Sequence, residues 1–318
     1  MAIIGKEIGK AKSILESGEL VAIPTETVYG LAGNAFNTEA IAKIFKVKNR
    51  PSFDPLIVHT YNLEQVNKIV KELPQKARLL AERFWPGPLT LLLPKQVIIP
   101  DLVTSGMDTV AVRIPNQPLT LDLLQSLDFP LVAPSANPFG YVSPTSAQHV
   151  DDQLGEKIDY VLDGGPCPVG IESTIVGFEG EDAIIHRLGG LSKEKIESII
   201  GKVRLMPHSS SNPKAPGMLK SHYSPGKKVI LGDIDFLIKK YGKDRIGIIS
   251  FTKPAEGIIL EHQAVLAPDG DLTTAAKNLF SSLRILDKKD IDLILAEPVP
   301  EHGLGLAIND RLKRAAAK

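Results

Sequence analysis

Hydrophobic residues follow two alternating spacings along the chain, one typical of buried strands and the other of amphipathic helices. Short apolar runs that end in polar residues predict strands, up to residue 203 at 20–23, 56–58, 89–93, 109–114, 131–133, 171–176 and 183–187. Apolar positions three or four residues apart predict helices between them, near 5–17, 38–45, 63–72, 74–84 and 121–127. Strands interleaved with helices indicate an α/β fold.

This pattern breaks between residues 204 and 226, where Ser, Pro and Gly dominate and predict a linker. Beyond it, strands predicted at 228–231, 245–251 and 291–296 alternate with helices at 234–241, 272–286 and 306–316. Such alternation predicts a small, Rossmann-like parallel sheet. No G-x-G-x-x-G follows its first strand, so dinucleotide binding is not supported. We therefore expect domains at 1–203 and 227–318, joined by a linker at 204–226.

The composition excludes several classes of protein but does not indicate a function. The chain has 318 residues, long enough for two domains, with 43% hydrophobic and 23% charged residues. Its apolar runs are too short to cross a bilayer, and we expect no secretory signal. A single cysteine, Cys167, excludes an intrachain disulfide and a cysteine-cluster metal site, which suits a cytoplasmic protein. Equal numbers of basic and acidic residues, 37 each, argue against a broad nucleic-acid surface.

Polar residues gather where the predicted strands end. Thr25 and Thr27 follow the first strand, His59 and Arg113 end later ones, and Ser135 with Asn137 follows another. Each alone is weak, because a strand-end hydroxyl is more often a turn former and an arginine there is usually a surface residue. Ligands of sheet proteins nevertheless often bind at such ends.

The segment from Lys48 to Pro55 adds two cations and two prolines, with Asp54 between them. Proline fixes the backbone, so this loop is expected to be stiff and to aim Lys48 and Arg50 in one direction. A Lys and an Arg together suit a polyanion, although a solvated basic helix end is an equal reading. The whole set holds cations, hydroxyls and amides but no G-x-S-x-G, H-E-x-x-H or Walker sequence. Phosphate positioning therefore fits better than covalent catalysis.

Several of these segments resemble a known family. P-T-E-T-V-Y-G-L, the K-x-R of Lys48 and Arg50, R-I-P at Arg113, S-A-N at 135–137 and E-S-T-I-V resemble the YrdC-like family. The linker A-P-G-M-x-K-x-H-Y and the terminal G-L-G-x-A-I-N-D-R-L resemble its longer, two-domain threonylcarbamoyl-AMP synthases. The resemblance runs nearly end to end. It implies a twisted mixed sheet with flanking helices, followed by the smaller parallel-sheet domain.

The resemblance also implies a reaction and a set of residues. Members of the family condense L-threonine, bicarbonate and ATP, used with Mg²⁺, to threonylcarbamoyl-AMP and pyrophosphate, and a partner transferase modifies adenosine 37 of tRNA. The signature residues around the nucleotide would be Lys48, Arg50, Ser135 and Asn137. Threonine-side positions would be Thr27, His59, Arg113, Ala133 and Ser173. Further nucleotide-side positions would be Asp54, Thr109, Ser143, Arg187 and Tyr223. No metal ligands are assigned, and stable direct binding of nucleic acid or membrane is not expected.

In this reading Arg113 clamps the threonine carboxylate, and a linker lid with Pro216, Gly217 and Tyr223 shields the short-lived carbamate. His59 is the residue to test as a base, although a role in orienting threonine is favoured. Two alternatives stay open: an RNA-binding module, which predicts steep salt dependence, and a carbamoyltransferase that uses carbamoyl phosphate. The second domain is expected to anchor and time the lid.

Overall fold

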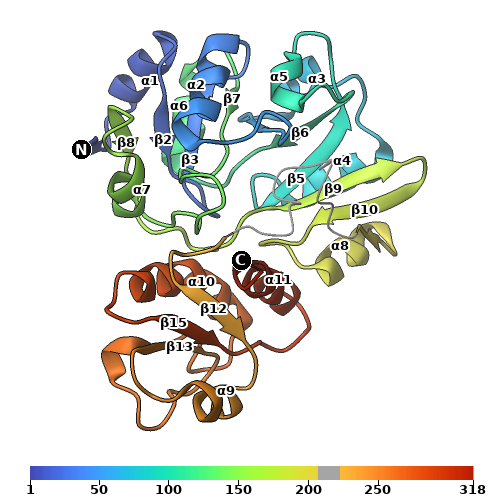
Figure 1. Cartoon of the computed structure of the whole chain (residues 1–318). Helices are drawn as coiled ribbons and strands as arrows, with labels where there is room; N and C mark the ends of the chain where they lie inside the picture. Colours follow the sequence, from blue (N-terminus) through green and yellow to red (C-terminus); the bar gives the residue numbers. More distant parts are fainter. Residues whose placement is uncertain (207–222, 318) are drawn as a thin grey trace.

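The computed structural model describes residues 1–206 and 223–317, which form two sheets with their helices (Figure 1). The larger sheet has eleven strands among these residues. In spatial order they are β1 (Ile3–Gly5), β8 (Tyr160–Leu162), β2 (Val21–Ile23), β3 (Gly30–Asn34), β7 (Leu131–Val132), β4 (Ile57–His59), β6 (Thr109–Arg113), β5 (Leu89–Pro94), β9 (Thr174–Glu179), β10 (Asp182–Arg187) and β11 (Arg204–Leu205). Parallel and antiparallel neighbours are mixed, which confirms the expected mixed sheet.

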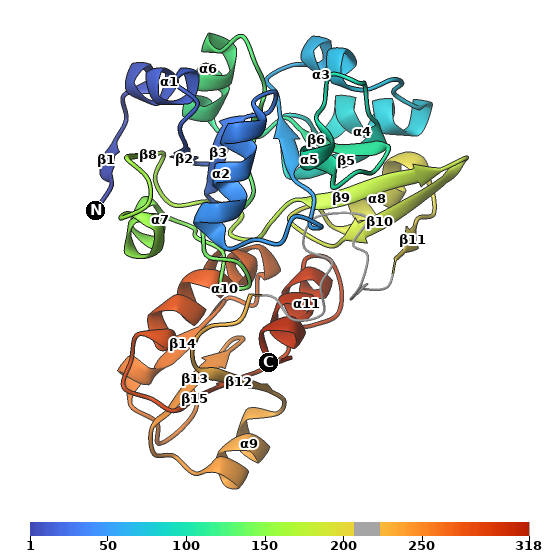
Figure 2. The same cartoon turned by 45° about the horizontal axis from the view of Figure 1, so that its top comes forward.

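Helices flank this sheet and complete its core. They are α1 (Ile8–Glu16), α2 (Thr38–Lys48), α3 (Leu63–Ile69), α4 (Gln75–Phe84), α5 (Asp101–Thr104), α6 (Pro118–Ser126), α7 (Ala147–Leu154) and α8 (Lys193–Ile200). Seen from a second direction, α1 and α6 lie side by side over one part of the sheet and α4 lies beside α8 (Figure 2). The strands between them supply fully buried residues such as Leu31, Val58 and Val112.

Helix α2 shows how local sequence places site residues. The Asn37 side chain accepts hydrogen bonds from the amides of Glu39 and Ala40 and so begins the helix. Its end is set by Asn49, whose φ of 52° is left-handed, a conformation that asparagine tolerates better than most residues. The turn that follows buries Arg50, whose amide donates to the Phe45 carbonyl oxygen.

The smaller sheet is all parallel, as the sequence predicts. Its order is β12 (Lys228–Leu231), β15 (Leu293–Ala296), β13 (Ile246–Ser250) and β14 (Gln263–Val265). The connections between its strands carry α9 (Ile234–Tyr241), the 3₁₀ turn η1 (Leu260–His262) and α10 (Leu272–Asp287), and α11 (Gly305–Ala315) follows the last strand. Helices α10 and α11 lie between this sheet and the larger part of the molecule, and α9 lies on its far side (Figure 1).

The two parts are joined by a buried polar contact as well as by apolar packing. Arg284 of α10 donates to the carbonyl oxygens of Ser143 and Val142, and its guanidinium stacks 5.1 Å from the centre of the Tyr141 ring. Burial lowers the pKa of Arg284 to about 10, so it stays charged near neutral pH. The loop 141–143 is therefore held by the second domain.

Some elements differ from the sequence predictions. The helix expected from residue 5 begins at Ile8, because Ile3–Gly5 pairs with the distant β8. Strands β3, β8 and β14 and helix α8 are not predicted from the sequence, because glycine or short length hides their periodicity. Strand β11 lies inside the predicted linker and pairs with β10. Residues 207–222 of the predicted linker, which include Pro216 and Gly217 of the predicted lid, lie outside the described residues, whereas Tyr223 is described.

Candidate active site

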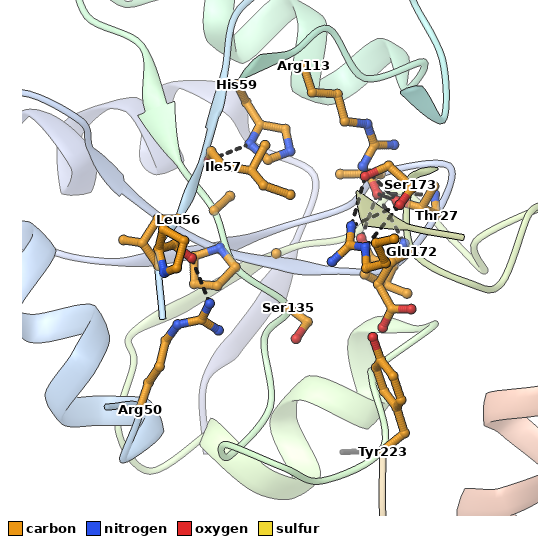
Figure 3. A pocket seen from close by; sticks show the side chains of 17 residues that line it. Thr27, Arg50, Leu56, Ile57, His59, Arg113, Ser135, Glu172, Ser173 and Tyr223 are labelled. Carbon is orange, nitrogen blue, oxygen red and sulfur yellow. Dashed lines mark hydrogen bonds between the residues drawn. The ribbon is translucent and has the colours of Figure 1, made fainter. Parts of the chain in front are cut away.

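The ends of several strands meet at one edge of the larger sheet and surround a pocket (Figure 3). Strands β4 and β6 run parallel with His59 opposite Arg113, so both side chains reach this edge together. The pocket lining includes nine of the residues that the resemblance assigns to a substrate, namely Thr27, Arg50, His59, Arg113, Ala133, Ser135, Ser173, Arg187 and Tyr223, and also Thr25. The structure therefore gathers all five threonine-side candidates, and four of the nine nucleotide-side candidates, around one space.

Arg113 lies at one end of this pocket and is almost wholly buried. Its Nη1 donates to the Thr27 hydroxyl at 2.8 Å, and its Nε donates to the Gly87 carbonyl at 3.2 Å. Its Nη2 lies 2.7 Å from a Glu26 carboxylate oxygen, in contact but without the alignment of a hydrogen bond. The fork is thus held in one plane at the pocket wall, a geometry suited to a carboxylate ligand.

His59 stands beside Arg113 and is neutral at physiological pH. Burial, assisted by the nearby Arg113 charge, lowers the pKa of His59 to about 3. Its Nδ1 lies 3.2 Å from the Ile57 carbonyl oxygen, which can only accept, so Nδ1 carries the proton. The other ring nitrogen, Nε2, is then an acceptor in the pocket lining. A group with so low a pKa is a poor general base, and the geometry suits ligand orientation.

Lys48 does not line the pocket but lies behind it. Its ammonium is buried and donates to the carbonyl oxygens of Ser135, at 2.5 Å, and of Asn137. Burial, with repulsion from Arg50, lowers the pKa of Lys48 well below its usual value. The lysine therefore fixes the S-A-N loop. By doing so it also positions the Ser135 side chain, which lines the pocket.

Arg50 does line the pocket, and the proline-flanked loop fixes its plane. Its Nε and Nη2 donate to the carbonyl oxygens of Asp54 and Pro55, and Nη2 forms an ion pair of 3.0 Å with the Asp54 carboxylate. Burial lowers the pKa of Arg50, and Asp54 opposes that shift. Asp54 thus acts on the arginine instead of lining the pocket itself.

Three other predicted residues also lie outside the lining. Asn137 donates through Nδ2 to the carbonyl oxygens of Pro138 and Tyr141 and so shapes the loop after β7. Ser143 donates to the Glu172 carboxylate at 2.5 Å. Thr109 begins β6, at the opposite end from Arg113, and the structure does not bring it to the pocket.

Ser173 lines the pocket and contacts two other side chains. Its hydroxyl lies 2.7 Å from that of Thr90 and accepts a hydrogen bond of 3.0 Å from Arg187 Nη2. Arg187 also donates through Nε and Nη2 to the Ser173 carbonyl oxygen. Burial lowers the pKa of Arg187 to about 10, so the guanidinium remains a cation in the pocket wall.

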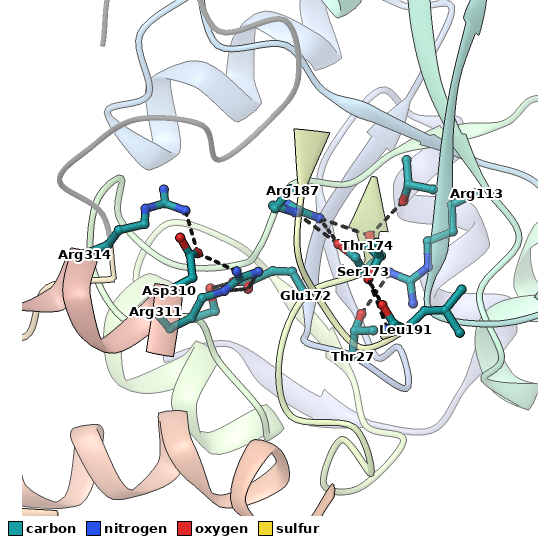
Figure 4. A network of polar contacts seen from close by, with 12 residues as sticks. Thr27, Arg113, Glu172, Ser173, Thr174, Arg187, Leu191, Asp310, Arg311 and Arg314 are labelled. Carbon is teal, nitrogen blue, oxygen red and sulfur yellow. Dashed lines mark hydrogen bonds and ion pairs between the residues drawn. The ribbon is translucent and has the colours of Figure 1, made fainter. Parts of the chain in front are cut away.

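Sequence reasoning missed Glu172 and its partner. Glu172 lines the pocket beside Ser173, and its carboxylate pairs with Arg311 of α11 (Figure 4). Both residues stand in motifs already noted, E-S-T-I-V and N-D-R-L. The available signal was an acidic residue directly before a site serine, but no sequence pattern could pair residues 139 positions apart.

The described residues hold no group of three or more His, Cys, Asp or Glu side chains placed to bind a metal ion. In residues 1–206 and 223–317, no helix has the length and apolar character that a membrane crossing needs.

Comparison with known proteins agrees with this geometry. Residues 13–189 match the Sua5/YciO/YrdC family, described as "Telomere recombination", and residues 191–317 match the "Threonylcarbamoyl-AMP synthase, C-terminal domain". A threonylcarbamoyl-AMP synthase of Pyrococcus abyssi is 41% identical over 96% of this chain and 93% of its own length. The chain belongs to the threonylcarbamoyl-AMP synthase family. A second member, from Bacillus subtilis, is 39% identical over 98% of this chain and 93% of its own length.

The family's fold extends over both domains. The crystal structure of P. abyssi Sua5 complexed with L-threonine matches this chain with a TM-score of 0.92 and 40% identity, over 99% of this chain and 97% of the other. The predicted fold class, a YrdC-like mixed sheet followed by a Rossmann-like parallel sheet, is confirmed at this level.

Proposed function

We propose that this chain is an L-threonylcarbamoyladenylate synthase, which converts L-threonine, bicarbonate and ATP to threonylcarbamoyl-AMP and pyrophosphate. Family membership supports this activity, as does the threonine bound by a full-length structural relative. The observation that carries the proposal is the pocket itself. One end of the pocket holds Arg113 with Thr27 and His59. Two further cations, Arg50 and Arg187, come from other parts of the chain and also line the pocket.

Each end suits one part of the substrates. The Arg113 fork receives the threonine carboxylate, while the acceptor nitrogen of His59 takes a hydrogen bond from the threonine amine or hydroxyl. Arg50 and Arg187 face the nucleotide phosphates, where charge develops as pyrophosphate leaves. These residues bind and orient the substrates, and the low pKa of His59 speaks against an imidazole base.

The reaction balances without an enzyme nucleophile. The threonine nitrogen bonds to the carbon of bicarbonate, with loss of water, or to the carbon of carbon dioxide, with loss of a proton, and either route gives a carbamate. A carbamate oxygen then attacks the α-phosphorus of ATP. The bond from that phosphorus to the bridging oxygen of the β-phosphate breaks, and pyrophosphate leaves. This last step makes the enzyme a nucleotidyltransferase.

Mg²⁺ belongs to the substrate, as MgATP. The described residues of the pocket lining supply hydroxyls and guanidinium groups, and the one carboxylate among them, Glu172, is paired with Arg311. Such a donor set fits a metal carried by phosphate oxygens and water, as Mg²⁺ usually is beside ATP. The ion would neutralise phosphate charge during the transfer.

The product would pass to a transferase that acts on adenosine 37 of tRNA, and we place both steps in the cytoplasm, where tRNA and ATP are available. An RNA-binding role for this pocket has less support. Arg113 is 3% exposed, too deep to reach the phosphate backbone of a folded RNA.

The proposal is tested by pyrophosphate release from ATP, Mg²⁺ and bicarbonate with each amino acid in turn. We expect release that requires both threonine and bicarbonate and is lost in Arg50→Ala. Serine, which lacks the methyl group, is the most demanding control. Release that is equal without threonine would overturn the assignment.

A further inference from the structure

The helix that ends the chain contacts the pocket through a buried ion pair. Arg311 of α11 is 0% exposed, and its Nε and Nη2 both donate to Glu172 Oε2 at 3.1 Å. Its Nη1 donates to Asp310 at 2.7 Å. Glu172 belongs to the first domain and lines the pocket, so this pair joins the second domain to the pocket wall (Figure 4).

Both oxygens of Glu172 are thereby occupied. Oε1 accepts from the Ser143 hydroxyl, and Oε2 accepts from Arg311. Although burial by itself raises the pKa of Glu172, the charges of Arg311 and Arg187 outweigh it and keep the pKa below its usual value. The carboxylate is ionised and lies within the electrostatic reach of two arginines, of which only Arg187 lines the pocket.

The same helix packs on Tyr223, another lining residue. The guanidinium carbons of Arg311 and Arg314 lie 5.1 and 4.6 Å from the centre of the Tyr223 ring, and the Phe280 ring of α10 lies 5.5 Å away. Two pocket residues from different parts of the chain thus share Arg311 as a neighbour.

We propose that Arg311 is a positioning residue for the nucleotide end of the pocket, acting through Glu172 and Tyr223. Arg311 engages the Glu172 carboxylate so that this carboxylate does not recruit Arg187. Arg187 then keeps its bonds to Ser173 and its place in the wall that faces the phosphates. The inference rests on the proposed function, and it gives the second domain a direct part in nucleotide binding.

Removing Arg311 alone leaves a buried carboxylate, and Arg187 is the other cation whose charge acts on it. An unpaired buried charge is strongly destabilising, so nearby side chains that can pair with it are expected to move toward it. The Arg187 side chain should therefore turn toward Glu172 and away from the nucleotide. The hydrogen bonds of Arg113 to Thr27 and Gly87 do not involve Arg187, so threonine binding through Arg113 should change little.

The test compares Arg311→Gln and Arg311→Lys with Lys313→Ala, a control on the exposed face of the same helix. We expect Arg311→Gln to raise the KM for ATP about tenfold or more while the KM for threonine stays within about twofold. Lys313→Ala should leave both KM values close to those of the wild type. Arg311→Lys, which keeps the charge but loses the planar fork, should have a KM for ATP between those of Lys313→Ala and Arg311→Gln. Equal rises in both KM values, or no rise in either, would overturn the proposal.

A double-variant cycle separates positioning from simple loss of fold. In a Glu172→Gln background no carboxylate competes for Arg187, so the further change Arg311→Gln should cost at least about threefold less in ATP affinity than it does in the wild type. Additive costs would show that Arg311 does not act through Glu172. Thermal unfolding of each variant confirms that the folded protein is being compared.

Equilibrium binding of MgATP without threonine or bicarbonate distinguishes this inference from the proposed function. If the wild type binds MgATP but forms no threonylcarbamoyl-AMP, the function fails while the ratio of affinities between wild type and Arg311→Gln still tests Arg311. If the wild type binds no MgATP, both proposals fail. If affinity is equal in the two proteins, only the inference fails.

Discussion

Arg113 at the end of β6 donates to the hydroxyl of Thr27 across 2.8 Å, although 86 residues separate them in the chain. The bond joins the segment that follows β2 to the strand that pairs with β4. It fixes the guanidinium against the pocket wall before a ligand arrives. Preorganised donors of this kind bind a carboxylate without the cost of ordering a long side chain.

Replacing this fork should affect threonine selectively. In Arg113→Lys, a point charge replaces two parallel donors, and we expect the KM for threonine to rise by about a hundredfold. The KM for ATP should change less than about threefold. Steady-state pyrophosphate release with each substrate varied separately measures both values. A rise confined to ATP would contradict the placement of threonine at Arg113.

His59 should link the stability of the protein to pH. The pKa of His59 is about 3 in the folded protein and about 6.5 when unfolded, so between these values the unfolded chain binds the extra proton. Folding stability should therefore fall as pH falls from 6.5 toward 3, by roughly 1–2 kcal/mol between pH 6.5 and 5 for this group.

Denaturant unfolding at several pH values checks this. His59→Asn should flatten the dependence of the unfolding free energy on pH by the equivalent of up to about one bound proton. The control is His302→Asn, since His302 is exposed. Some slope should remain in both, because burial also lowers the pKa of His149, to about 4. An unchanged slope in His59→Asn would show that the imidazole is not buried in its neutral form.

Lys48 gives a third prediction, because its ammonium contacts two carbonyl oxygens of the S-A-N loop. Lys48→Met removes these bonds and lets the loop that carries Ser135 relax. We expect activity to fall by about a hundredfold or more, comparable with the loss of a preorganised donor. Lys46→Met is the matched control, since Lys46 precedes it by half a helical turn and is not buried. Equal activities of the two variants would refute a role for Lys48.

Removal of residues 227–318 should lower turnover sharply and leave the first domain folded. The cut deletes Arg311 and Arg284, and it exposes Val28, Val142 and Ile171, which pack in one cluster with the second domain. Their exposure should lower solubility as well. Circular dichroism and turnover of the truncated chain measure the two effects. Full activity of the truncated chain would show that the second domain does not support the pocket.

The sequence predicted strand ends and their chemistry better than it predicted contacts. His59 and Arg113 end apolar runs, as predicted, and the pairing of β4 with β6, which was not predicted, places them side by side. Lys48 could be recognised as a site residue but not as a buried support, because its carbonyl partners come from a loop 87 residues away. Periodicity predicts burial of apolar residues and says nothing about such polar pairings.

The same limit explains Glu172 and Arg311. Charged residues are expected on the surface, and only the docking of α11 on the first domain buries this pair. Short strands such as β3 and β8 were missed for a related reason. Their pairing with distant strands, and not their own pattern, defines them. Residues 207–222 of the predicted lid lie beyond the described parts of the chain, so the lid stays a prediction.

The most direct measurement is mass spectrometry of the nucleotide product formed from ATP, Mg²⁺, threonine and ¹³C-bicarbonate. We predict a threonylcarbamoyl-AMP that carries one ¹³C atom and appears together with an equal amount of pyrophosphate. The product should be absent without threonine and strongly reduced in Arg113→Lys. Release of pyrophosphate with only AMP as the nucleotide product, and no incorporation of label in a freshly quenched reaction, would contradict the account.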